Sequence, residues 1–310
     1  MGAQLRVYRR RIRSVNATKK ITRAMELIAS SRIVKAQARV VATEPYARAL
    51  YRAISIAASN NSSLDHPLLR SAGDAKRAAV LLISADRGLA GAFSPSVIKQ
   101  SEQLVERNQE RGVDTDIYVS GRKGVAYYTF RDRQMMKTWT GSSDAPEYVR
   151  AEEMANELLK AYLTPSEEGG VDEIYLVFTH FINRVNQVVE VSRLLPLEVV
   201  DNPVKGANVE YTEDSARKAV LPLYEFEPEP QQVLDSLLPH YLAFEIWEAL
   251  LQSAASEHAA RQRAMKSATD NASDLVKSLT RRANQARQAE ITQEISEIVG
   301  GADALSSAGK

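Results

Sequence analysis

The residues whose types and spacing could support nucleotide binding or catalysis lie in one glycine-containing loop. Gly88 and Gly91 follow the apolar run Ala78–Ile83, and a glycine-rich turn after a buried strand can cradle the phosphates of a nucleotide. The dinucleotide fingerprint needs GxGxxG, whereas this loop supplies only GxxG, and GxxxxGK[ST] does not occur in the chain. We therefore interpret the glycines as residues that shape a turn. Asp86 and Arg87 could form a catalytic pair, but an ion pair that fixes the loop is the favoured interpretation.

Other side chains able to act as acids, bases or metal ligands are dispersed along the sequence. No histidine stands at a metal-ligand spacing such as HExxH; the four are His66, His180, His240 and His258. The absence of cysteine excludes disulfides, thiolate metal sites and a cysteine nucleophile. Asp and Glu are frequent, but no nucleophile is accompanied by a base. The sequence therefore predicts no catalytic residue, no metal site and no cofactor.

Charge is unevenly distributed, although the net charge is only +1. Residues 1–43 hold eleven Lys or Arg against the single acid Glu26. Such a segment can bind nucleic acid, an anionic membrane or an acidic protein surface. Nucleic-acid binding favours cations interleaved with aromatic residues, whereas Tyr8 is the only aromatic before Tyr46. A solvated helix face explains any single cation, but the excess favours contact with an acidic protein surface and no nucleic acid.

Two long segments must position these side chains. From His240 to Val299 the chain contains neither glycine nor proline, and an uninterrupted helix of that length would be about 90 Å long. From Ala3 to Glu44 both residue types are again absent, and Tyr46–Ser59 can continue the same direction beyond Pro45. Helices this long need a partner to cover their apolar face. Because the glycine-containing middle lies between them, we expect the two helices to pair in antiparallel orientation.

The expected contact between the helices follows a heptad spacing. In the C-terminal helix the stripe consists of Arg261, Met265, Ala268, Ala272, Leu275, Leu279, Ala283 and Ala286. After a change of phase, as in a coiled coil with a stutter, it resumes with Ile291, Ile295 and Ile298. In the N-terminal helix the stripe begins with Leu5, Tyr8, Ile12 and Val15. It continues in a shifted register with Ile21, Met25, Ile28, Ala36 and Val40.

The middle of the chain predicts an α/β sheet. Short apolar or alternating runs indicate strands at Ala78–Ile83, Asp116–Val119, Glu173–Phe181 and Gln187–Leu195. Helical spacing covers Val97–Arg111 and Pro146–Leu163. The last two strands are joined by a short polar turn and form a hairpin, so we expect a parallel sheet with an antiparallel edge. A further edge strand is possible at Tyr224–Phe226, and Pro239 is expected in the first turn of the C-terminal helix.

Composition limits the class of protein further. Hydrophobic residues make up 44% and charged residues 25% of the 310 positions, as in an ordinary globular protein. The basic N-terminus lacks an apolar h-region, so we expect no secretory signal. No apolar run reaches the roughly eighteen residues of a membrane span. The sequence therefore predicts a protein that is cytoplasmic or peripheral to a membrane.

Several motifs in a fixed order carry a resemblance to a known family. They are RIRSVNATKKITRAM at 11–25 with ELIASSR at 26–32, DRGLAG at 86–91, FIN at 181–183 with LLPL at 194–197, AASEHAAR at 254–261, and ARQAEITQEI at 286–295. Each is moderately specific, and in this order and spacing they are strongly specific together. The chain resembles the gamma subunit of the F-type ATP synthase over essentially its whole length.

The resemblance agrees with the architecture that the element pattern predicts. This is an α/β protein in which the N- and C-terminal helices form a long antiparallel two-helix coiled coil, with an inserted α/β, Rossmann-like sheet domain. The expected divisions are a helical segment at 1–65, the sheet domain at 75–200, a linker with an edge strand at 201–230, and a second helical segment at 231–310.

The resemblance also implies a function. The chain would be the non-catalytic central rotor stalk of a proton-translocating ATP synthase, one copy inside a ring of three alpha and three beta subunits. It would carry the epsilon subunit at its foot and stand on the membrane c-ring, at the cytoplasmic face of the plasma membrane. Proton-driven rotation of the c-ring would turn the shaft. Its asymmetric coil would then shift the conformational equilibrium of each catalytic site in turn.

Matching the family's motifs assigns roles to individual residues. Contacts with the catalytic ring fall at Met25, Arg32, Lys35, Arg261, Arg287, Gln288, Thr292, Glu294 and Ile298, and the loop after the first strand contains Asp86, Arg87 and Gly88. Chloroplast relatives carry a cysteine pair for redox control, and this chain has no cysteine. The loop Thr164–Gly170 looks longer than in many relatives, and it is predicted to be a surface insertion.

Two other classes of protein stay open on the residues alone. A non-rotary coiled-coil scaffold or tether would share the two helices, but it gives no reason for the ITQEISEI pattern near the C-terminus. A nucleotide-dependent enzyme built on the α/β domain is weakened by the missing phosphate loop. Copurification of one copy with a ring of three plus three nucleotide-binding subunits would separate the three classes.

Overall fold

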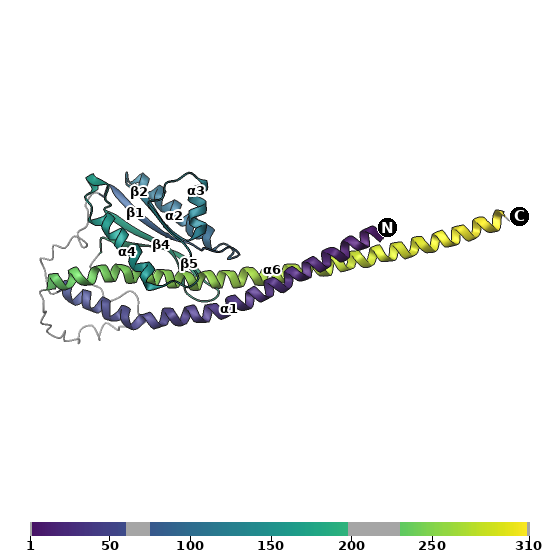
Figure 1. Cartoon of the computed structure of the whole chain (residues 1–310), viewed down its shortest axis with the longest axis horizontal. Helices are drawn as coiled ribbons and strands as arrows, with labels where there is room; N and C mark the ends of the chain where they lie inside the picture. The colour runs from purple at the N-terminus through teal and green to yellow at the C-terminus, as the bar shows by residue number, and fades with distance from the viewer. Residues whose placement is uncertain (1, 60–74, 198–229, 309–310) are drawn as a thin grey trace. The chain divides into compact units, whose positions relative to one another are not determined.

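The computed structural model describes residues 2–59, 75–197 and 230–308 (Figure 1). They divide into two compact units: unit 1 comprises residues 1–31 and 260–310, and unit 2 comprises residues 32–259. The long helices α1 (Gly2–Ser59) and α6 (Pro230–Ala308) each contribute to both units. The predicted edge strand at Tyr224–Phe226 lies outside the described residues, as does the linker at 201–230 apart from residue 230. The four domain boundaries stay a prediction.

Unit 2 is built on a five-stranded sheet. Its strands are β1 (Arg77–Ile83), β2 (Asp114–Ser120), β3 (Lys137–Trp139), β4 (Glu173–Phe181) and β5 (Gln187–Leu195). They lie in the order β3-β2-β1-β4-β5, parallel throughout except that β5 runs antiparallel to β4. The central strand β1 has the sequence RAAVLLI and is buried along nearly its whole length, because parallel sheets are covered on both faces.

Helices cover both faces of this sheet. Those between the strands are α2 (Phe93–Glu110), α3 (Arg122–Phe130) and α4 (Tyr148–Leu163), and a 3₁₀ turn, η1, spans Ser166–Glu168. Alternate residues of β1 point to opposite faces. Val80 and Leu82 pack with Val97 of α2, whereas Leu81 and Ile83 join a core that contains α4 and residues 238–250 of α6. The core of unit 2 therefore has two layers, one on each side of the sheet.

The predicted strands and helices of the sheet domain are confirmed, with two additions. Helix α3 and strand β3 were not predicted from the sequence. The predicted strand Asp116–Val119 is followed closely by Gly121, which precedes α3, and the helix begins at Arg122. A nine-residue helix with a glycine inside it and a three-residue strand are too short to show a clear hydrophobic period.

Both long helices continue through a proline. The predicted continuation of α1 beyond Pro45 is confirmed, since a single helix spans Gly2–Ser59. The expectation that Pro239 lies in the first turn of α6 was wrong, because the helix begins at Pro230. Residues on both sides of Pro239, including Leu238 and Leu242, pack into the sheet core, and this packing outweighs the loss of one backbone hydrogen bond. No described helix carries a segment both long and apolar enough to cross a membrane.

In unit 1 the two helices run side by side in opposite directions (Figure 1). The buried positions on α1 are Thr22, Glu26 and Ala29, and those on α6 include Met265, Thr269, Ala272, Leu279 and Ala283. The predicted antiparallel pairing is confirmed, but its register was wrong at several positions on both helices. Ile21 and Ile28 are 61% and 54% exposed, and Leu275 is 48% exposed.

The register differs because polar residues occupy the seam. The hydroxyls of Thr22 and Thr269 lie 2.8 Å apart across it. The Glu26 carboxylate accepts hydrogen bonds at 2.9 Å from Arg23 Nη1 to each of its oxygens. Since these partners satisfy the polar groups, an apolar stripe was not required at these positions. Ile291, Ile295 and Ile298, which we predicted to resume the seam, are exposed.

Candidate functional site

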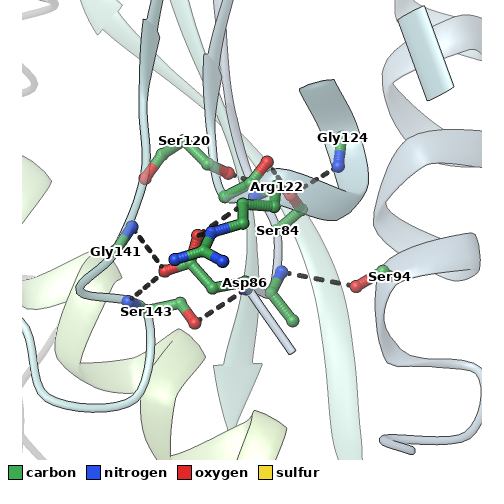
Figure 2. Close-up of polar contacts among 10 residues, drawn as sticks. Ser84, Asp86, Ser94, Ser120, Arg122, Gly124, Gly141 and Ser143 are labelled. Carbon is green, nitrogen blue, oxygen red and sulfur yellow. Dashed lines mark hydrogen bonds and ion pairs between the residues drawn. The ribbon is translucent and has the colours of Figure 1, made fainter. Parts of the chain in front are cut away.

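Asp86 lies just beyond β1 and joins the carboxyl ends of three strands (Figure 2). Its Oδ1 accepts a hydrogen bond from the backbone amide of Arg122 at 3.1 Å. Its Oδ2 accepts from the amides of Gly141 and Ser143, each at 2.9 Å. The amide of Asp86 in turn donates to Ser143 Oγ at 2.9 Å. One carboxylate therefore holds together the segments that follow β1, β2 and β3.

The environment of Asp86 favours its ionised form. Burial alone would raise the pKa of the Asp86 carboxyl, but the hydrogen bonds from Ser143, Gly141 and Arg122 outweigh burial and lower it. The Arg122 guanidinium lies on the same side, with Nε 3.8 Å from Oδ1. A carboxylate with a lowered pKa and with both oxygens engaged is a poor general base. The geometry supports a structural role for Asp86.

Ser84 makes a second junction next to Asp86 (Figure 2). Its Oγ lies 2.9 Å from the carbonyl oxygen of Ser120, to which it donates, and accepts a hydrogen bond from the Gly124 amide at 2.9 Å. Gly121 has φ +99°, and a Cβ at this position would stand 2.1 Å from the carbonyl oxygen of Ser84. Only glycine allows β1 and the turn into α3 to approach this closely.

This edge of the sheet is where open α/β folds bind nucleotides. Backbone amides at such an edge commonly hold an anionic group of the ligand. Here the three amides are bound to Asp86, so an internal carboxylate takes the donors that a phosphate would need. Within residues 2–59, 75–197 and 230–308, no group of three or more His, Asp or Glu side chains could hold a metal ion.

The predicted pairing of Asp86 with Arg87 was wrong. The Arg87 guanidinium lies 3.6 Å from the carboxylate of Asp144, while the carboxylate of Asp86 is engaged by backbone amides. Asp86 and Arg87 lie in a bent part of the loop and their side chains have different partners, so adjacency in sequence did not indicate contact. Gly88 adopts no left-handed conformation, and a Cβ there would meet only Lys123, at 3.6 Å. The steric demand for glycine lies at Gly121 instead.

Asp144 connects this edge to both long helices. Its Oδ2 accepts a hydrogen bond from Arg32 Nη1 of α1 at 2.7 Å. Its carbonyl oxygen lies 3.2 Å from Nε2 of the buried His258 on α6. Arg32, predicted to contact a partner protein, thus has an internal partner. No motif in the sequence indicated Asp144, because its partners on the two long helices stand more than a hundred positions away.

The remaining predicted contact residues lie on α1 and α6. Met25 is half-buried, Lys35 is exposed and Arg261 is buried. The C-terminal group is exposed throughout: Arg287, Gln288, Thr292, Glu294 and Ile298. Side chains in this part of α6 form hydrogen bonds within the helix, as from Ser296 Oγ to the Thr292 carbonyl oxygen and from Gln293 Nε2 to Glu297 Oε1, each at 2.9 Å. The structure therefore presents these side chains on a helix surface rather than in a pocket.

Comparison with known proteins identifies the family. The family model described as ATP synthase matches residues 4–305. The ATP synthase gamma chains of Acidothermus cellulolyticus and Kineococcus radiotolerans are 57% and 58% identical to this chain, covering 100% of it and 99% of each relative. The chain belongs to the ATP synthase gamma chain family.

Solved structures agree with the gamma-chain assignment at the level of the fold. A chain of the Euglena gracilis mitochondrial ATP synthase, in a structure of its OSCP, F1 and c-ring, matches with a TM-score of 0.65 and 17% identity. The match covers 100% of this chain and 97% of that one. A chain from the rotor of the same synthase has a TM-score of 0.63 at 14% identity, covering 94% of this chain and 100% of that one.

This gamma-family chain also contains a half-buried acid with a shifted pKa, which no motif in the sequence indicated. Glu245 of α6 accepts a hydrogen bond from the hydroxyl of Tyr51 on α1, and the Tyr51 ring stands edge-on to that of Tyr241. Burial raises the pKa of Glu245 to about 7, with the nearby Glu248 acting in the same direction. The available signal was its position on the apolar face of α6, between Leu242 and Ala249.

Proposed function

We propose that this chain is the rotating shaft of a proton-translocating F-type ATP synthase. Membership of the gamma-chain family and the shared fold support the central-stalk role. The observation that carries the proposal is the exposed end of α6. From Arg287 to Gly300 every residue except Glu290 is exposed, although Ile291, Ile295 and Ile298 are apolar. A row of exposed apolar side chains on an otherwise polar helix marks a contact surface for a partner protein.

The shaft acts through contacts that differ between the catalytic sites. A single helix pair has no threefold symmetry, so a ring of three alpha and three beta subunits around it would meet a different face at each catalytic site. Differential contact is what shifts a conformational equilibrium. Arg287, Gln288, Thr292, Glu294 and Ile298 supply this contact from α6, whereas Arg261 is buried within the chain and is left out of it. From α1 we assign Met25 and Lys35 to this contact. Arg32 belongs to it through the part of its guanidinium that does not bind Asp144.

The other partners and the location follow from the same role. The sheet domain carries the epsilon subunit and stands on the membrane c-ring, which turns it. The chain is then peripheral to the membrane, at the cytoplasmic face of the plasma membrane. It contributes no catalytic residue and needs no cofactor or metal of its own. The hydrogen bonds of Asp86 support this proposal. Backbone amides at the edge of the sheet, which could otherwise bind a phosphate, donate to the Asp86 carboxylate instead.

A static scaffold is the alternative, and membership of the gamma family does not favour it. The composition of the native complex tests the proposal. We expect an affinity tag on this chain to recover three alpha, three beta and one epsilon subunit for each copy, together with the c-ring. We expect the purified chain alone to bind ATP weakly and to hydrolyse none. Recovery of two or more copies per catalytic ring, or stoichiometric ATP binding to the isolated chain, would contradict it.

A further inference from the structure

We infer that the loop Gly141–Ala145, here called the clamp loop, fixes both shaft helices to the sheet so that they turn together with it. The inference rests on the proposed function, because a clamp of this kind matters only in a chain that carries torque. Arg32, Asp144 and His258 are then positioning residues, which hold the shaft helices in place while the chain rotates. They need not touch any catalytic subunit to act in this way.

The clamp loop is first anchored to the sheet. Its Gly141 and Ser143 amides donate to the carboxylate of Asp86, and Ser143 Oγ accepts from the Asp86 amide (Figure 2). Asp86 is bound by the Arg122 amide at the same time. The loop is therefore attached to the segments after β1 and β2 as well as to β3, from which it emerges. A force on the clamp loop is therefore transmitted to the sheet through several hydrogen bonds. Those accepted by the charged Asp86 carboxylate are the stronger ones.

The clamp loop then reaches both long helices through one residue. The side chain of Asp144 binds Arg32 of α1 at 2.7 Å, and its carbonyl oxygen lies 3.2 Å from His258 Nε2 of α6. Arg87 adds a second cation 3.6 Å from the same carboxylate. The partners of Asp144 come from α1, from α6 and from the loop after β1. A single residue thus connects three parts of unit 2 that are far apart in sequence.

The helices enter this contact at a particular place in the chain. Residues 32 and 259 are the points where the chain passes from unit 2 to unit 1, and Arg32 and His258 stand at or next to them. Any torque between the two units must pass through the helices at these residues. A contact that holds the helices here is positioned to prevent them from slipping against the sheet.

The two helices depend on the clamp to different degrees. α6 is also held by apolar packing, since Leu242, Ile246 and Leu250 belong to the same core as β1 and β4. The part of α1 in unit 2 adds the half-buried Ile54 to the edge of that core, and it also packs on α6 through the ring contacts Tyr46–Phe244 and Tyr51–Tyr241. We therefore expect loss of the Arg32–Asp144 bond to loosen α1 more than α6. A hydrogen bond between charged groups that is partly exposed shifts an equilibrium by roughly threefold to tenfold.

The test measures coupling in the complete complex reconstituted into lipid vesicles. Arg32→Gln and Asp144→Asn are each expected to lower the ratio of ATP-driven proton pumping to ATP hydrolysis by roughly threefold to tenfold. Hydrolysis itself should be retained, because it occurs in the catalytic ring. A merely structural defect would lower assembly and leave the ratio of the assembled complexes unchanged. The matched control is Arg48→Gln, which removes an exposed ion pair with Glu44 on the same helix and should leave the ratio unchanged.

Reversal of the pair guards against variants that assemble poorly. Arg32→Glu combined with Asp144→Arg restores an ion pair of opposite polarity, and it should recover at least half of the lost coupling. An unchanged pumping ratio in both single variants would overturn the clamp. So would a reversed pair that assembles and couples no better than Arg32→Gln. Either result would refute the clamp alone, provided that the complex still contains one copy of this chain per ring. A different stoichiometry would contradict the proposed function itself.

Discussion

The hydroxyls of Thr22 on α1 and Thr269 on α6 lie 2.8 Å apart, and each residue is only 8% exposed. Their separation in sequence is 247 positions, so this contact joins the two ends of the chain within unit 1. Each hydroxyl also lies within hydrogen-bonding distance of a carbonyl oxygen of its own helix, that of Lys19 or of Met265. A buried polar pair of this kind favours one register of a helix pair over its neighbours.

The threonine pair predicts a measurable coupling between the helices. Thr22→Val or Thr269→Val should each lower the free energy of unfolding by about 1 kcal/mol, because valine keeps the shape but removes a hydrogen-bonding group. The double variant should lose less than the sum of the two, because the interaction between the hydroxyls is then lost only once. Urea denaturation of the four proteins measures this. Thr18→Val, which removes an exposed hydroxyl bonded within α1, is the control. Strict additivity would mean that the hydroxyls do not interact.

The observed register predicts different tolerance at two leucines of α6. Leu279 is 5% exposed, whereas Leu275 is 48% exposed. Leu279→Asp should lower the free energy of unfolding by about 3 kcal/mol, because it buries a charge in the seam. Leu275→Asp should lower the free energy of unfolding by less than about 1 kcal/mol, because the side chain is half exposed. Thermal unfolding of the purified chain, followed by circular dichroism, compares them. If Leu275→Asp proved the more damaging change, the register of the seam would be wrong.

Much of the fold could be predicted from periodicity. The run AAVLLI of β1 and the boundaries of β4 and β5 follow from hydrophobic pattern, because a buried sheet imposes it at every residue. The register of the seam could not be predicted in the same way. Thr22, Glu26 and Thr269 occupy buried positions that look polar in sequence, while Ile21 and Ile28 look like core residues and are exposed.

The network at the carboxyl edge of the sheet was only partly predictable. Position after a buried strand indicated that Asp86 was a loop residue, but its partners are backbone amides, which leave no trace in residue type. Asp144 meets Arg32 and His258 through distances in sequence of 112 and 114 positions. Contacts set by tertiary packing at such separations need a structure. The predicted partner contacts at Arg287 to Ile298 stay a prediction, since they concern a surface.

The turn after β2 predicts a strong dependence on one glycine. Gly121→Ala should lower the free energy of unfolding by about 1–3 kcal/mol, because φ is +99° and the added Cβ would stand 2.1 Å from the Ser84 carbonyl oxygen. Gly88→Ala should be tolerated, because its nearest neighbour would be a flexible lysine side chain at 3.6 Å. Urea denaturation of both variants tests this. Equal stability of the two would show that the close approach of Gly121 to Ser84 is not maintained.

Glu245 predicts a pH-dependent stability. Its pKa in the folded chain is about 7, above the ordinary 4.5, so the folded state binds the proton more tightly than the unfolded state does. The protonated Glu245 therefore adds to the free energy of unfolding fully below pH 4.5, and this contribution is lost as the pH rises through about 7. Its size is on the order of 3 kcal/mol. Tyr51, Tyr241, Glu248 and Glu190 are the titratable groups nearby.

Replacement of Glu245 by glutamine isolates this effect. Glu245→Gln keeps a neutral side chain of the same size at every pH, so its free energy of unfolding should fall less than that of the original chain between about pH 5.5 and pH 8. Urea denaturation at several pH values gives both curves. Glu294→Gln, which changes an exposed acid on the same helix, is the control. Parallel curves for the original chain and Glu245→Gln would show that the carboxyl does not titrate in this range.

Rotation is tested most directly by a reversible covalent link between α6 and the catalytic ring. The chain has no cysteine, so Gln288→Cys introduces its only thiol, at an exposed position of α6. Paired with a cysteine placed in the shaft-facing loop of a beta subunit, it should form a disulfide with one of three equivalent subunits. ATP hydrolysis by the complex, measured before oxidation, after it and after reduction, is expected to fall in proportion to the cross-linked fraction and to recover on reduction. Undiminished turnover in a fully cross-linked complex would contradict a rotating shaft.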